Sequence, residues 1–221
     1  MNESRAVGAW GDDDGASNAG AVYVLLLHGD GTLKAYSKIS NNGGGLSNVL
    51  PVNGRFGSAV TALGDADGDG NLDLLVGAYG NSDAGAVYCV FLRKEGSAKG
   101  SNMWTLDAAL ADDGFGIAIG NVWGGFGPES SGLGGTVRVA VGASGDDDEK
   151  PDSGAVYIVD LLVEDLRTPA PTVTAVNARV TVGDWWKFSN DAGELPFTIG
   201  RESPKNCSPR ADDCRRLLSD I

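Results

Sequence analysis

Nine residues in the middle of the chain carry four carboxylates at alternating positions. The segment reads Asp65-Ala-Asp67-Gly-Asp69-Gly-Asn71-Leu-Asp73, and its two glycines allow the positive φ angles that would curl the chain around one point. Carboxylates that converge within a few ångströms repel one another unless a cation lies among them. Oxygen ligands in a flexible loop suit Ca²⁺, whereas Mg²⁺ needs a tighter octahedral geometry. The spacing therefore predicts a Ca²⁺ site formed by Asp65, Asp67, Asp69, Asn71 (through its backbone carbonyl) and Asp73.

Two other kinds of loop begin in a similar way. An EF-hand loop requires a Glu at its twelfth position, but the twelfth residue counted from Asp65 is Val76. The flanking segments are also typical of strands rather than helices, so the sequence excludes an EF-hand and, likewise, a dockerin-like repeat. The alternative that stays open is a solvated Asp-Gly turn that binds no metal.

The elements that must position this loop belong to a unit that recurs. Two strings appear three times in the same order: Val-Gly-Ala begins at Val7, Val76 and Val141, and Gly-Ala-Val-Tyr begins at Gly20, Gly85 and Gly154. A Phe-Gly pair opens the second unit at Phe56 and the third at Phe115. The chain therefore contains three copies of one supersecondary unit, the first without its front half.

Each unit has the pattern of short strands. In the second unit the expected strands are 57–64, 72–78 and 85–92, with a weaker fourth strand at 102–106. The counterpart of that fourth strand in the first unit is 32–39. Four strands in roughly 60–70 residues, with no helical period between them, are typical of a propeller blade. The signatures of WD40 and kelch repeats are absent from these units.

Composition agrees with a Gly-rich β protein and excludes several function classes. The chain has 221 residues, of which 34 are Gly, and its formal net charge is −13. This negative charge disfavours binding to nucleic acid or to an anionic membrane. A single His, His28, excludes a multi-His zinc site and a His-based triad within this chain. The expected chemistry is ion binding rather than turnover, and the chain is not expected to be an enzyme.

Residues 56–91, which read FGSAVTALGDADGDGNLDLLVGAYGNSDAGAVYCVF, resemble an FG-GAP repeat, the blade unit of the integrin α-subunit β-propeller. The resemblance rests on the Phe-Gly opening, the acidic loop, Val-Gly-Ala and the closing Gly-Ala-Val-Tyr, and with the partial copies it covers about 5–160. It implies a Ca²⁺-braced blade of an extracellular recognition propeller. It also implies that the metal loop is structural and lies on the face opposite the ligand.

The expected fold is therefore all-β, a partial β-propeller with about two and a half recognisable four-stranded blades. The repeats span about 5–40, 56–106 and 115–162, within a propeller region at 1–162. The remainder, 163–221, is expected to be either a degenerate fourth blade or the start of an Ig-like domain. Propellers typically have 4 to 8 blades, so we expect the neighbouring blades to lie outside this chain.

The expected function is adhesion or ligand recognition outside the cell or at its surface, with a protein or glycan partner on a cell or in the matrix. No membrane span is expected, because no run of about 18 apolar residues occurs. The N-terminus also lacks a signal peptide, which fits either a cytosolic protein or a fragment whose true start lies upstream. The incomplete first repeat favours the fragment. Two alternatives stay open: a non-catalytic accessory region of a secreted hydrolase or phospholipase, and a purely structural repeat in an extracellular coat.

The third unit departs from the pattern of the second. Its loop is about six residues longer and contains Glu129 as its only acid, so we expect no Ca²⁺ there. Equivalent turns in the three units are also polar, with acids or amides at 12–14, at 81 and 83, and at 146–149. They form either an acidic rim that attracts a cationic ligand or ordinary hairpin turns, and the latter interpretation is favoured.

Some features outside the repeats carry weaker predictions. Adjacent Trp185 and Trp186 could stack on a sugar, although packing is the favoured interpretation. Asn2 and Asn206 fit the N-glycosylation pattern. The two cysteines near the C-terminus, at 207 and 214, could form a small disulfide loop in an oxidising compartment or stay reduced.

Overall fold

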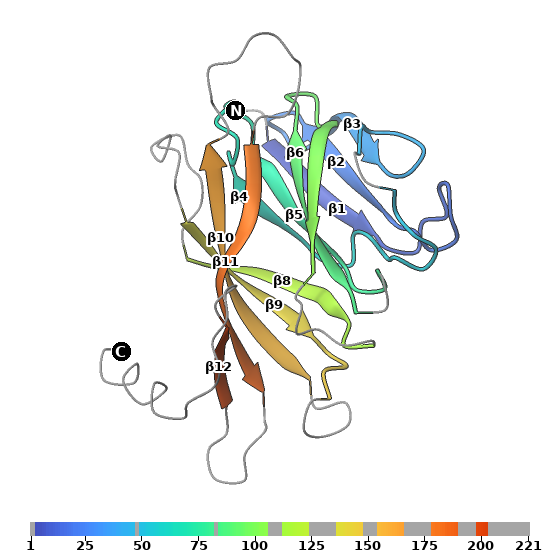
Figure 1. Cartoon of the computed structure of the whole chain (residues 1–221). Coiled ribbons are helices and arrows are strands. Elements are labelled where there is room, and N and C mark those ends of the chain that lie inside the picture. The colour runs from blue at the N-terminus through green and yellow to red at the C-terminus, as the bar shows by residue number, and fades with distance from the viewer. Residues whose placement is uncertain are drawn as a thin grey trace, which may run out of the picture.

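The chain folds into three antiparallel β-sheets that follow one another in chain order, as Figure 1 shows. This computed structural model describes residues 3–46, 49–81, 84–105, 112–123, 136–147, 154–165, 178–189 and 198–202. Within these ranges there is no α-helix, and therefore none long and apolar enough to cross a membrane. None of the three sheets closes on itself. The architecture is that of a partial β-propeller, and the predicted all-β fold class is confirmed.

The first sheet has three strands in the order β1-β2-β3. These strands are β1 (Glu3–Ala9), β2 (Ala21–Leu27) and β3 (Leu33–Ile39). The repeated strings lie opposite each other in this sheet, because Gly8 of Val-Gly-Ala pairs with Val22 of Gly-Ala-Val-Tyr. Among the described residues β1 is the first strand, and this sheet has three strands where the second has four.

The second sheet is a complete four-stranded unit in the order β4-β5-β6-β7. Its strands are β4 (Val60–Gly64), β5 (Asp73–Ala78), β6 (Ala86–Leu92) and β7 (Ala98–Trp104). The predicted fourth strand at 102–106 was therefore placed too late. The segment that begins at Ala98 consists mainly of small and polar residues, yet it pairs along the whole of β6 from Leu92 to Val87. Pairing with a buried neighbour outweighs a weak intrinsic strand preference.

The third sheet has five strands in the order β12-β11-β10-β9-β8, which corrects the prediction of a four-stranded blade. Its strands are β8 (Phe115–Trp123), β9 (Thr136–Ala143), β10 (Ala155–Asp165), β11 (Ala178–Ser189) and β12 (Thr198–Glu202). The two additional strands come from the segment 163–221. The assignment of that segment to a degenerate blade or to the start of an Ig-like domain stays a prediction.

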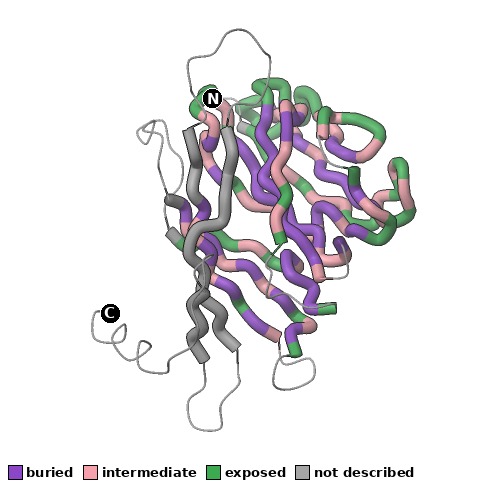
Figure 2. Tube along the Cα trace, viewed as in Figure 1, coloured by how far each residue is buried: buried purple, intermediate pink, exposed green. Residues whose placement is uncertain are grey.

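The two central strands of the second sheet are buried on both faces: every residue of β5 and β6 is buried, as the purple strands of Figure 2 show. One face packs against the first sheet through residues that include Leu74, Val76 and Tyr88. The opposite face packs against the third sheet through Leu75, Cys89 and others. This burial on two sides explains why these strands are continuous apolar runs instead of alternating ones.

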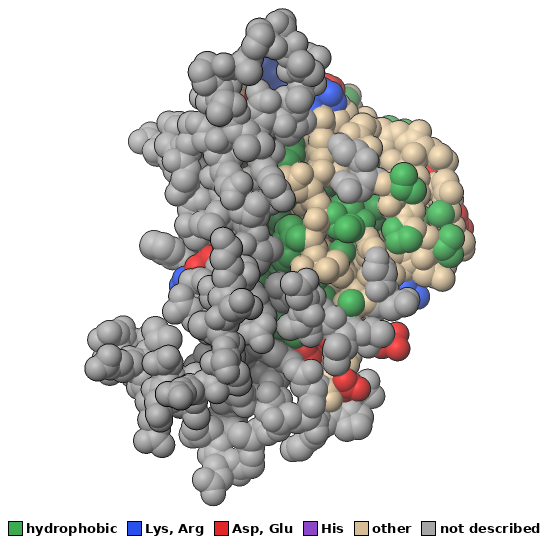
Figure 3. All heavy atoms as spheres, viewed as in Figure 1, with side chains coloured by type: hydrophobic (Ala, Val, Ile, Leu, Met, Phe, Trp, Pro, Cys, Tyr) green, Lys and Arg blue, Asp and Glu red, His purple; other side chains and the backbone are tan. Residues whose placement is uncertain are grey.

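The outer face of the first sheet is exposed in part. Large hydrophobic side chains of this sheet and its turn remain accessible, among them Val7, Trp10, Leu33 and Tyr36. Val7 occupies the position in its unit that Val76 occupies in the second unit, where the side chain is fully buried against a neighbouring sheet. In the view of Figure 3, hydrophobic and uncharged side chains cover most of the described surface, and acidic side chains lie mainly near its border.

Candidate metal centre

The acidic loop connects β4 to β5 and is anchored at both ends by the second sheet. Its two glycines have the left-handed backbone that the sequence predicts, with φ of 73° at Gly68 and 87° at Gly70. A residue with a side chain rarely adopts these angles, so the Gly positions allow the tight curl. The ladder between β4 and β5 also shifts register just before the loop, between Ala62 and Gly64.

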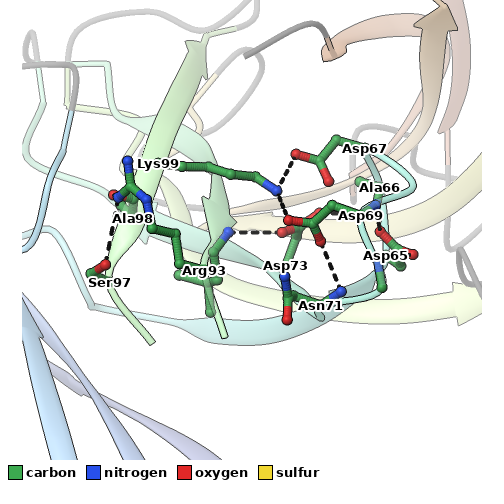
Figure 4. Close-up of polar contacts among 12 residues, drawn as sticks. Asp65, Ala66, Asp67, Asp69, Asn71, Asp73, Arg93, Ser97, Ala98 and Lys99 are labelled. Atoms are coloured by element: carbon green, nitrogen blue, oxygen red, sulfur yellow. Dashed lines mark hydrogen bonds and ion pairs between the residues drawn. The ribbon is translucent and has the colours of Figure 1, made fainter. Parts of the chain in front are cut away.

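The curl brings three of the predicted ligands together. One carboxylate oxygen each from Asp65, Asp67 and Asp73 lies within 4.8 Å of the others. Figure 4 shows the side chains of these three residues around the acidic loop, with Lys99 approaching Asp67. Three carboxylates at this spacing form the kind of oxygen-rich centre that a hard cation occupies.

Asp73 forms the buried base of the centre. Its two oxygens accept hydrogen bonds from the backbone N–H of Ala66 and of Leu92, both at 2.8 Å. Burial raises the pKa of Asp73 to about 7; the charge of Asp67 acts in the same direction and the two backbone donors oppose it. The chain therefore holds a carboxylate where ionisation is costly unless a positive charge lies nearby.

Asp65 fixes the turn of the loop. Its Oδ1 accepts the backbone N–H of Asp69 at 2.9 Å, and its Oδ2 accepts that of Gly70 at 2.8 Å. Asx-type contacts of this kind commonly order tight loops. They hold the Asp65 carboxylate in its orientation toward Asp67 and Asp73.

Asp67 has an oxygen without a partner. The Asp67 side chain is only 8% exposed, and its Oδ1 is buried and accepts no hydrogen bond. A buried carboxylate oxygen left unpaired is costly, and such a group in a native structure calls for an explanation such as an ion. The donor set and this oxygen together fit a divalent cation bound among Asp65, Asp67 and Asp73.

The other two predicted ligands, Asp69 and Asn71, contact each other, and Asp69 also contacts Lys99. Asp69 lies outside the group of three and forms an ion pair with Lys99, while the backbone N–H of Asn71 donates to Asp69 Oδ1 at 2.8 Å. Lys99 also approaches Asp67, with Nζ 2.6 Å from Oδ2. Sequence reasoning missed Lys99, which lies on β7 and is distant from the loop in the sequence.

Lys99 keeps its charge in this position. Burial alone would lower the pKa of the ammonium, but its hydrogen bonds to Asp67 and Asp69 outweigh burial and raise the pKa. The four carboxylates of the acidic loop therefore lie beside one fixed positive charge.

The polar turns predicted as a possible rim take part in packing within their own units. Asn81 and Asp146 are buried, and each bonds to the Tyr of its Gly-Ala-Val-Tyr string: Asn81 to Tyr88, and Asp146 to Tyr157, whose hydroxyl donates at 2.6 Å. In the first unit Lys38 instead bridges Asp12 and Asp14, at 2.8 and 2.5 Å. These contacts favour the interpretation as hairpin turns.

Several predictions fall on residues outside the described ranges. These residues are Glu129 in the long loop of the third unit, Asp83, Asp148 and Glu149 in the turns, the glycosylation candidates Asn2 and Asn206, and the cysteines Cys207 and Cys214. Trp185 and Trp186 lie in β11, where they pair with Val159 and Ile158 of β10. The predictions for all of them stay predictions.

Comparison with known protein families identifies the second repeat unit, which contains the acidic loop. The family model of the FG-GAP repeat matches residues 56–88, which run from the Phe-Gly opening to the Tyr of Gly-Ala-Val-Tyr. No curated protein matches the chain. The matched range contains the whole acidic loop and the strands β4 and β5 that flank it. This chain therefore contains an FG-GAP repeat, at residues 56–88.

Proposed function

We propose that this chain is a calcium-binding module of an FG-GAP propeller that serves adhesion or ligand recognition outside the cell or at its surface. The observation that carries the proposal is the buried, unpaired Oδ1 of Asp67 beside the carboxylates of Asp65 and Asp73. The ion would bind to Asp65, Asp67 and Asp73, with Asp69 and Asn71 at the rim of the same loop. It would supply charge neutralisation and a rigid link within the loop.

Calcium is favoured over other ions by the chemistry of the donors. All five predicted ligands offer oxygen, and neither His nor Cys is present in the loop, so soft-metal sites are excluded there. The loop connects two strands by a flexible, glycine-containing path, which suits the variable geometry of Ca²⁺ better than the strict octahedron of Mg²⁺.

The role of the ion follows from the elements that the loop touches. Asp73 opens β5 and accepts a hydrogen bond from Leu92 at the end of β6, so the centre joins the loop to two strands of the sheet. A bound cation would stabilise the second sheet, which packs against both of its neighbours. The module would then present its surface loops in a fixed arrangement to a protein or glycan partner.

Thermal unfolding tests the calcium proposal. The wild-type chain and Asp67→Asn, which keeps the shape of the side chain but loses its charge, are melted in Ca²⁺ and in EDTA. The wild type should melt several degrees higher in Ca²⁺, because a ligand that binds only the folded state stabilises it. Asp67→Asn should lose most of that difference. Equal wild-type melting temperatures in the two buffers would contradict the proposal.

A further inference from the structure

We propose that Lys99 is a built-in counter-ion of the acidic loop, which competes with a divalent cation and thereby sets how tightly the loop binds Ca²⁺. This inference rests on the calcium-binding function proposed above and deepens it. It assigns to a residue outside the loop the control of the loop's affinity.

The geometry shows an ammonium inserted among the loop carboxylates. Lys99 Nζ lies 2.6 Å from Asp67 Oδ2 and also pairs with Asp69, and the lysine side chain is only 16% exposed. Figure 4 shows the side chain extended from β7 across the loop, with its nitrogen between the two carboxylates. Lys99 thus contacts the same Asp67 whose other oxygen is buried and unpaired.

A β-bulge directs Lys99 toward the loop. Along the β6–β7 ladder, Phe91 pairs with Gly100 and Leu92 with Ala98, so Lys99 is the additional residue of the bulge. Bulges re-aim side chains and are over-represented beside functional sites. The N–H of Leu92, opposite this bulge, donates to Asp73 at 2.8 Å, so the bulge region contacts the centre twice.

The first unit contains the same feature without the acidic loop. Along the β2–β3 ladder, Leu26 pairs with Ala35 and Leu27 with Leu33, so Lys34 is the additional residue there. Lys34 precedes Lys99 by 65 residues, which is also the spacing between the first two Gly-Ala-Val-Tyr strings, at Gly20 and Gly85. Lys34 is exposed and has no acidic partner among the described ion pairs. The chain therefore offers a matched pair of lysines, one with the loop and one without it.

Competition between the ammonium and Ca²⁺ follows from charge. With Lys99 in place, the formal charges of the four carboxylates and the ammonium sum to −3, and the ammonium occupies oxygens of Asp67 and Asp69 that an ion could otherwise bind. Removal of the ammonium leaves −4 and frees oxygens of Asp67 and Asp69. Unit charges a few ångströms apart in a partly buried site interact strongly, so Lys99→Gln should tighten Ca²⁺ binding by about tenfold or more.

Calorimetric titration with Ca²⁺ alone tests this inference on the full chain. The variants are Lys99→Gln, Lys99→Met as a second neutral replacement, and Lys34→Gln, which makes the same charge change at the matched bulge. Both Lys99 variants should bind more tightly than the wild type, by about tenfold or more. Lys34→Gln should bind like the wild type. The gain from Lys99→Gln should also shrink as NaCl is raised, because salt screens the interaction.

The outcomes separate this inference from the function on which it rests. If the wild type binds Ca²⁺ and both Lys99 variants bind it equally or more weakly, the proposed role of Lys99 is wrong, whereas the calcium site itself is supported. Equal gains from Lys34→Gln and Lys99→Gln would overturn it too, because the effect would then reflect net charge. No binding by the wild type and by every variant would overturn the calcium proposal itself.

Discussion

Gly85 and Phe115, which belong to successive repeat units, form a parallel backbone bridge between the second and third sheets. The N–H of Phe115 donates to Ala84 O at 2.9 Å, and its ring packs edge-on against Tyr157 of its own unit, with centroids 5.5 Å apart. Gly20 and Phe56 repeat the bridge between the first and second sheets. The Phe-Gly and Gly-Ala-Val-Tyr strings therefore recur because they make the contact between neighbouring units.

Replacement of Gly85 by Ala should weaken this contact. Gly85 has φ of 94°, and a Cβ there would lie 2.1 Å from the carbonyl oxygen of Phe115, which is backbone and has little freedom to move. Backbone strain and steric overlap together should lower the free energy of unfolding by about 2–4 kcal/mol. Urea denaturation measures the loss.

Gly31→Ala is the matched control for this substitution. Gly31 has a similar φ of 83°, but a Cβ there would meet nothing within 4 Å. It should therefore show the backbone cost alone, about 1 kcal/mol. Equal losses at Gly85 and Gly31 would show that the close approach of the units contributes nothing.

Alkaline pH should destabilise the chain through Tyr88. Burial raises the pKa of Tyr88 to about 12, and a hydrogen bond from Asn81 opposes this rise in part. The pKa is higher in the folded chain than in the unfolded one, so the stabilisation is complete below pH 10 and is lost as the pH rises from 10 to 12. The loss should reach about 2 kcal/mol, which denaturant titrations across this pH range would measure.

Tyr88→Phe isolates this contribution from the other groups that titrate at high pH. The variant should start less stable, because it lacks the bond to Asn81, but its stability should fall less steeply above pH 10. Parallel slopes for the two proteins would show that the Tyr88 hydroxyl titrates normally.

Asp73→Asn should destabilise the chain even without calcium. The Asp73 carboxylate accepts two buried backbone N–H groups, from Ala66 and Leu92, whereas an amide offers one oxygen and a donor that faces the second N–H. The expected loss in EDTA is about 1–3 kcal/mol. Asp67→Asn should instead show its main loss in Ca²⁺. If Asp73→Asn and Asp67→Asn lost the same stability as each other in EDTA and in Ca²⁺, a structural role for Asp73 distinct from the metal-binding role of Asp67 would be contradicted.

The parts of the fold that recur in each unit could be predicted from the repeated sequence strings. The recurring strings mark strand ends and the contacts between sheets, and the glycines of the acidic loop have the φ angles that the loop requires. The start of β7 could not be predicted, because Ala98 and the residues after it have little strand preference and are ordered by pairing with β6.

The candidate site was predicted only in part. The spacing of the acids identified Asp65, Asp67 and Asp73, which the curl brings together. Asp69 pairs instead with Lys99, which lies on β7, two strands away from β5 in the sheet. The one sequence signal for Lys99 is its 65-residue offset from Lys34, and that offset has meaning only once the bulges are known.

A crystal structure of the chain grown in saturating Ca²⁺ would show directly whether an ion binds among the three carboxylates. We expect density for an ion in contact with Asp65, Asp67 and Asp73, with oxygen distances of about 2.3–2.6 Å. We also expect Lys99 Nζ to be withdrawn from Asp67. A structure in which Lys99 still pairs with Asp67 and Asp69, and no ion lies among the three carboxylates, would contradict it.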